Sequence, residues 1–216
     1  MHNVNWRIVS IHLNNSPAGP NFKAMSIHQP HGTAARPART AAKAMVAVLT
    51  GPDTPLVATS AELPRWRALT PLALWSTVSI RDTSPDEILR GVAAELARQG
   101  AEAHQLILLA ESKTARTALE LVLQGILDCA GILAIALPCA ALPFRVVPTA
   151  AAVRLVVQQE ERGDVPVALI TALQADDIDV RITSLNRHDT RAVASAAETF
   201  VLELVANASR QIRHGV

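Results

Sequence analysis

Three side chains that together could transfer an acyl group follow one another along this chain: Ser112, Asp164 and His188. A serine hydroxyl is a poor nucleophile until a base takes its proton, and the imidazole that does so needs a carboxylate on its other ring nitrogen. Ser112 would attack a carbonyl carbon, His188 would carry the proton, and Asp164 would orient His188. Glu161 is the second choice for the carboxylate.

Ser112 stands where a short apolar run, residues 106–110, meets a helical pattern over residues 113–127. A sharp strand-to-helix turn of this kind lifts a serine hydroxyl above a sheet, with small residues on both sides because strand and helix approach closely. Here Ala110 and Thr114 occupy the two flanking positions that are usually glycine. Ala is small enough, whereas Thr adds a branched side chain in a crowded place.

The remaining apolar runs indicate which elements hold these residues in place. Strands are predicted at residues 45–49, 74–80, 106–110, 130–137, 153–157 and 178–185, and helices at residues 61–69 (disturbed by Pro64), 84–100, 113–127, 166–173 and 192–208. The continuous apolar runs are typical of strands covered on both faces. Alternation of strands and helices predicts one α/β domain, a three-layer α/β/α sandwich with a mostly parallel sheet. In such a sheet, ligands bind at the carboxyl ends of the strands, which is where the three residues fall.

Over about residues 44–208 the sequence resembles the small phospholipase/carboxylesterase group of the α/β-hydrolase superfamily. The similar segments are residues 106–137 around Ser112, residues 153–166 at the acid, residues 186–188 at the histidine turn and residues 49–51 at the first loop. The resemblance implies an esterase or thioesterase acting on a small ester, with no cofactor and no metal. It also implies that the backbone N–H groups of Lys113 and Asp53 stabilise the oxyanion.

Other interpretations stay open. An ungapped match places Arg162, not an acid, at the family's carboxylate position, which favours a catalytically inactive homologue that binds or scaffolds, with a homodimer as one form. A different α/β domain, such as a flavodoxin-like module, could show the same residue order by chance. Ser112 could also be an ordinary helix N-cap, Asp164 a cap of the next helix, and His188 an exposed turn residue.

The composition of the chain argues against some classes of binding partner. The chain has 216 residues, enough for one buried core, and its hydrophobic fraction of 50% is that of a globular protein. A net charge of +1 and an aromatic content of 3% argue against a nucleic-acid surface. No apolar run is long enough for a membrane span, and no secretory signal is recognisable, so we expect a cytoplasmic location.

Two further features have plain explanations. Cys129 and Cys139 lie in apolar surroundings, so we interpret both as small core residues, not as a disulfide or metal pair. Residues 1–43 carry only basic charges and many turn-forming residues. We interpret that segment as irregular or partly disordered, ahead of a single domain over residues 44–216.

Overall fold

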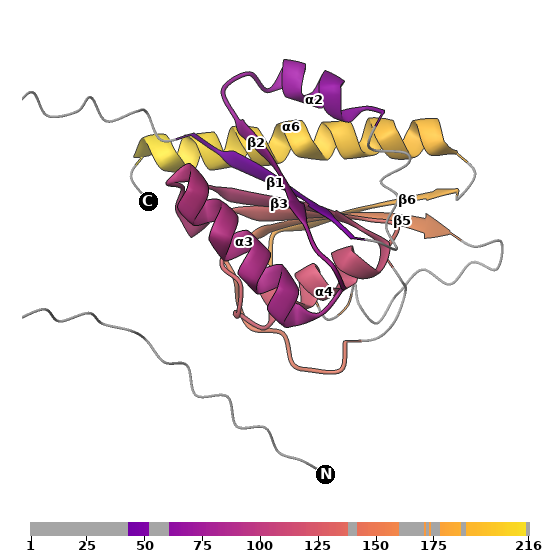
Figure 1. Ribbon diagram of the computed structural model, residues 1–216. Helices are drawn as coiled ribbons and strands as arrows, with labels where there is room; N and C mark the ends of the chain where they lie inside the picture. The colour runs from indigo at the N-terminus through magenta and orange to yellow at the C-terminus, as the bar shows by residue number, and fades with distance from the viewer. Residues whose placement is uncertain are drawn as a thin grey trace, which may run out of the picture. The chain divides into compact units, whose positions relative to one another are not determined.

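A sheet of six parallel strands forms the centre of the structure (Figure 1). The structure, a computed structural model, describes residues 43–51, 61–137, 142–159, 171, 173, 178–186 and 189–214. The strands are β1 (Met45–Thr50), β2 (Leu74–Ser79), β3 (Leu106–Glu111), β4 (Gly131–Ile135), β5 (Ala152–Gln159) and β6 (Val180–Asn186), in the order β2-β1-β3-β4-β5-β6. All five pairings are parallel, so every strand ends at the same edge of the sheet. We call this edge the carboxyl rim.

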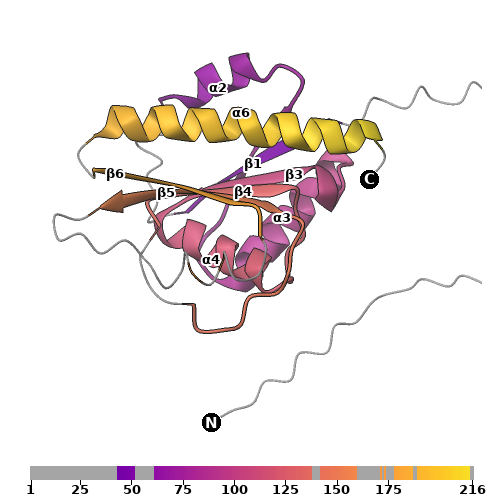
Figure 2. The same ribbon diagram turned by 180° about the vertical axis from the view of Figure 1, so that it is seen from behind.

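Helices cover both faces of the sheet, as Figures 1 and 2 show. One face carries α3 (Pro85–Gln99) and α4 (Ser112–Leu123), and the other carries α2 (Leu63–Leu69) and α6 (Thr190–His214). A short 3-10 turn, η1 (Ala103–Gln105), leads into β3. The predicted three-layer α/β/α arrangement is therefore confirmed.

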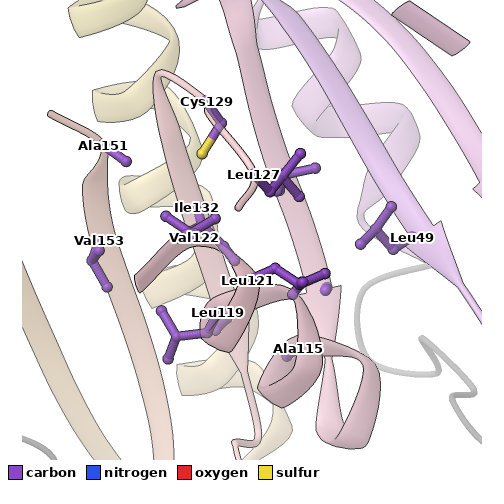
Figure 3. Close-up of a cluster of buried hydrophobic side chains, with 14 of the residues drawn as sticks. Leu49, Ala115, Leu119, Leu121, Val122, Leu127, Cys129, Ile132, Ala151 and Val153 are labelled. Carbon is purple, nitrogen blue, oxygen red and sulfur yellow. The ribbon is translucent and has the colours of Figure 1, made fainter. Parts of the chain in front are cut away.

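The two-sided cover explains why the central strands are apolar throughout. In β3, Leu106, Leu108 and Ala110 belong to the buried cluster beneath α3 and α4. Ile107 and Leu109 belong to the cluster beneath α6 and α2. Successive side chains of a strand point to opposite faces, so a strand buried on both sides needs apolar residues at every position. Figure 3 shows part of the first cluster, with Leu119 and Val122 of α4 beside residues of β4 and β5.

Local signals in the sequence fix two helix starts. The hydroxyl of Ser84 accepts a hydrogen bond from the backbone N–H of Glu87 at 3.4 Å, as expected for an N-cap, and α3 ends at Gly100 with φ of 62°. The expectation that Pro64 disturbs the helix predicted over residues 61–69 is wrong. Pro64 lies in the first turn of α2, where proline is tolerated because its missing N–H has no partner inside the helix.

The six predicted strands are all present, each with both ends within two residues of the prediction. Of the predicted helix over residues 166–173, the structure describes residues 171 and 173, both helical. The described residues belong to one compact unit, Arg39–Val216. The predicted irregular segment, residues 1–43, lies outside the described residues except for residue 43 and stays a prediction, as does the boundary at residue 44.

Candidate active site

Ser112 sits at the turn between β3 and α4 with a backbone φ of +55°. Glu111, the last residue of β3, is still extended, with φ −131° and ψ 149°. A positive φ is uncommon for any residue other than glycine, because the Cβ crowds the neighbouring carbonyl. Backbone strain of this kind concentrates at functional sites. Ser112 and Ala136 are the two non-glycine residues with positive φ in the part of the chain that the structure describes.

The explanation of Ser112 as an ordinary helix cap is wrong. The N-cap of α4 is Glu111, and its side chain makes no capping hydrogen bond. Ser112 follows that N-cap with a φ of +55°, whereas Ser84 shows what a capping serine looks like, with φ −70°, ψ 147° and a hydrogen bond to Glu87. The side chain of Ser112 is half-buried on the carboxyl rim. Its hydroxyl is therefore not occupied in closing the helix end.

The two residues that flank the turn are both fully buried. Ala110 is 0% exposed and lies opposite Ala134 of β4 in the parallel register. Thr114, at the second flanking position, is also 0% exposed. The expected crowding at Thr114 does not prevent the turn, because its branched side chain is accommodated inside the core. Ala110 and Thr114 can therefore take the places of the two usual glycines in a turn where the serine has a positive φ.

The start of α4 offers backbone N–H groups beside Ser112. The first N–H groups of an α-helix have no partner within the helix, and they carry the positive end of the helix dipole. Lys113 follows Ser112 directly, is exposed, and no acidic residue lies in the first turn. The assignment of the backbone N–H of Lys113 as an oxyanion donor stays a prediction. The second oxyanion candidate, Asp53, lies outside the described residues.

The rim also holds the ends of the strands that precede the other two candidates. Gln159 of β5 pairs in register with Asn186 of β6, and both strands end at the same edge as β3. Asp164 follows Gln159 by five residues, and His188 follows Asn186 by two. The topology therefore brings the strands that precede these candidates to the same rim as Ser112. The structure does not describe Asp164, His188, Glu161 or Arg162, and the triad itself stays a prediction.

The N-terminus of α6 is capped by a side chain. The carboxylate of Asp189 accepts a hydrogen bond from the backbone N–H of Ala192 at 2.8 Å, which caps α6. Val193 and Ala197 then pack into the cluster on the α6 side of the sheet. The capping residue of α6, Asp189, follows His188 directly in the sequence.

Solved structures share this architecture. FphF, a fluorophosphonate-binding serine hydrolase from Staphylococcus aureus, matches with a TM-score of 0.56 and 9% identity over 82% of this chain and 89% of that chain. An esterase of the bacterial hormone-sensitive lipase family matches with a TM-score of 0.57 and 12% identity over 80% and 79% of the two chains. The esterase PE8 matches with a TM-score of 0.53 and 20% identity over 76% and 94%. The chain has the α/β-hydrolase fold. No family profile matches the sequence, and no curated protein matches it.

In the α/β-hydrolase fold the nucleophile stands on a strained strand-to-helix turn, the nucleophile elbow. Ser112 occupies such a turn here, at the carboxyl end of a central strand. The acid and the base of this fold follow later in the chain, in that order. The order of Asp164 and His188 after Ser112 agrees with this arrangement.

Other candidate reactive groups to look for among the described residues are a cysteine and clusters of possible metal ligands. Burial raises the pKa of the Cys129 thiol to about 12, so Cys129 is an inert core residue as predicted, while Cys139 lies outside the described residues. Within the described ranges, no three His, Cys, Asp or Glu side chains lie close enough to hold a metal ion. No helix among those ranges has the length and apolarity to cross a membrane.

One residue that the sequence analysis missed is Glu111, whose side chain is buried directly before Ser112. The signal was present, because Glu111 is a charged residue at the end of an otherwise apolar run.

Proposed function

We propose that this chain is a serine hydrolase that cleaves a small ester or thioester, with Ser112 as its nucleophile. The observation that carries this proposal is the φ of +55° at Ser112, on the carboxyl rim of a sheet with the α/β-hydrolase fold. The solved structures with this fold named above as esterases and a serine hydrolase support the reaction class.

The proposed reaction has two halves. His188 takes the proton of the Ser112 hydroxyl while the oxygen attacks the carbonyl carbon, and the backbone N–H groups of Lys113 and Asp53 stabilise the oxyanion. The bond to the alcohol or thiol then breaks, and the leaving group receives the proton from His188. Water, activated by His188, releases the acid from Ser112. Asp164, or Glu161 in its place, holds the imidazole in orientation throughout.

A fluorophosphonate probe tests the proposal, because it reacts with an activated serine and not with an ordinary one. We expect the probe to label Ser112 of the folded protein, as located by peptide mass mapping, and Ser112→Ala to abolish labelling. The matched control is Ser79→Ala, since Ser79 also ends a strand at the carboxyl rim and should leave labelling unchanged. A folded wild-type protein that no probe concentration labels would refute the nucleophile.

A second candidate function is that of a catalytically inactive homologue that binds or scaffolds, as a homodimer in the cytoplasm. Arg162 at the family's acid position and the branched Thr114 at the elbow motivate it. Ester turnover that disappears in His188→Ala would exclude this function. Turnover that is absent in the wild type, together with normal folding, would favour it.

A further inference from the structure

Ala136, directly after β4, shares an unusual backbone conformation with Ser112. Its φ is +52°, and these two are the non-glycine residues with positive φ among the described residues. The glycines with positive φ in that part of the chain are Gly100 and Gly125, which lie just past the ends of α3 and α4. Where the chain needs a positive φ to end a helix it uses glycine, so an alanine in this conformation needs another explanation.

The two strained residues are neighbours on adjacent strands. β3 and β4 lie side by side in the sheet (Figure 2), and their pairing ends with Glu111 opposite Ile135. One residue further along each strand stand Ser112 and Ala136, so both occupy adjacent places at the carboxyl rim. Backbone strain of this kind concentrates where a protein binds or reacts. The strain at Ala136 therefore belongs to the same small region as the proposed nucleophile.

The side chain of Ala136, and not its backbone N–H, is the group that can meet a substrate. The N–H donates a hydrogen bond to the carbonyl oxygen of Val156, in β5, at 2.9 Å, so it is engaged within the sheet. The methyl group is half-buried and packs against the cluster on the α6 side of the sheet. A backbone hydrogen bond and a close-packed cluster fix the place of this methyl group. It therefore forms a rigid wall at the rim next to Ser112.

We propose that Ala136 is a specificity-determining residue of the hydrolase site, whose methyl group limits the size of the acyl group that binds beside Ser112. The inference rests on the proposed function. A branch on the carbon next to the substrate carbonyl adds volume close to the serine oxygen, where a fixed wall excludes it. An unbranched acyl group has no such bulk. The favoured substrates are then esters or thioesters of short, unbranched acids.

The experiment compares kcat/KM for p-nitrophenyl 2-methylpropanoate, a branched ester, with kcat/KM for p-nitrophenyl acetate. The wild type should prefer the acetate. Ala136→Gly removes the methyl group and suits a positive φ, so we expect the ratio of the branched ester to the acetate to rise about tenfold. Ala136→Asn introduces a larger side chain of a residue type that also tolerates a positive φ. It should lower the ratio below the wild-type value.

Ala130→Gly is the matched control. Ala130 directly precedes β4, at the end of the strand remote from Ser112, and it is half-buried against the same cluster as Ala136. Removing its methyl group should leave the wild-type ratio unchanged. An equal rise of the ratio in Ala130→Gly and Ala136→Gly would reflect a general loosening of the sheet and would overturn the assigned role.

Two further measurements separate the ways in which the inference can fail. Circular dichroism shows whether each variant is folded, and labelling of Ser112 by a fluorophosphonate shows whether the nucleophile is active. A labelled wild type whose ester ratio is unchanged in Ala136→Gly overturns the role of Ala136 alone. If Ala136→Gly does not fold, an unchanged ratio in Ala136→Asn overturns that role. A wild type that is not labelled and hydrolyses neither ester overturns the proposed function and this role together.

Discussion

The guanidinium of Arg154, in β5, donates a hydrogen bond to the carboxylate of Glu203, in α6, with 2.8 Å between Nη2 and Oε1. Arg154 is 1% exposed, and the same Nη2 lies 2.9 Å from Asp179, just before β6. A buried guanidinium with two carboxylates ties the last helix and the last two strands together.

The first prediction concerns this buried pair. Glu203→Ala leaves the buried guanidinium of Arg154 with one carboxylate in place of two, and we expect the free energy of unfolding to fall by about 2 kcal/mol. The control is Arg181→Ala, since Arg181 also contacts Glu203, at 3.1 Å, but its side chain is 63% exposed. That variant should lose less than about 1 kcal/mol. Urea unfolding at neutral pH measures both, and equal losses would contradict the burial argument.

A second prediction follows from the backbone of Ser112. Glycine adopts a φ of +55° without strain, whereas alanine does not. Ser112→Gly should therefore be more stable than Ser112→Ala by about 1 kcal/mol in urea unfolding, although both lack the nucleophile. At Ser195, inside α6, the order should be the reverse, with Ser195→Ala more stable than Ser195→Gly, because glycine is the poorer helix former. Greater stability of Ser112→Ala would show that the elbow is not strained.

Glu95 of α3 gives a prediction for acid stability. Hydrogen bonds from Arg98, and to a lesser extent from Ser76 and Gln99, lower the pKa of Glu95 from 4.5 to about 2 against the opposing effect of burial. Since the folded pKa lies below the unfolded value, the stabilisation is complete above pH 4.5 and is lost as the pH falls toward 2. The stability difference between wild type and Glu95→Gln should therefore shrink over that window.

The donors of Glu95 supply the control. Arg98→Ala should weaken this pH dependence more than Ser76→Ala, because the hydrogen bond from Arg98 is the largest cause of the lowered pKa. Urea unfolding at a series of pH values measures the effect. A difference between wild type and Glu95→Gln that is constant with pH would contradict the assignment.

The last prediction concerns Gly131, the first residue of β4. A Cβ at this position would lie 2.9 Å from the backbone oxygen of Ala152 and 2.6 Å from Cδ2 of Leu204. The backbone of β5 cannot yield easily, so Gly131→Ala should cost about 1–3 kcal/mol of stability. Gly100→Asn is the comparison, because nothing lies within 4 Å of its Cβ position and asparagine tolerates its φ of +62°. Thermal unfolding should place Gly100→Asn near the wild type and Gly131→Ala well below it.

The fold was predictable because its signals are local. The run from Leu106 to Ala110 is apolar at every position, which a strand requires when helices cover both faces. The start of α3 is indicated within four residues by Ser84, Pro85 and Glu87. The prediction for Pro64 was wrong because the effect of a proline depends on its place in the helix, and Pro64 lies in the first turn of α2.

The sequence by itself determined the order of strands and helices and selected Ser112 as the residue at a strand-to-helix turn, since apolar periodicity and turn residues act over a few positions. Only the tertiary structure decided that Ser112 is held at positive φ, that Glu111 is buried beside it, and that Arg154 meets Glu203 across 49 residues of chain. The physical reason is that backbone strain, burial and charge pairing depend on which residues pack around a given residue. Those neighbours come from distant parts of the sequence.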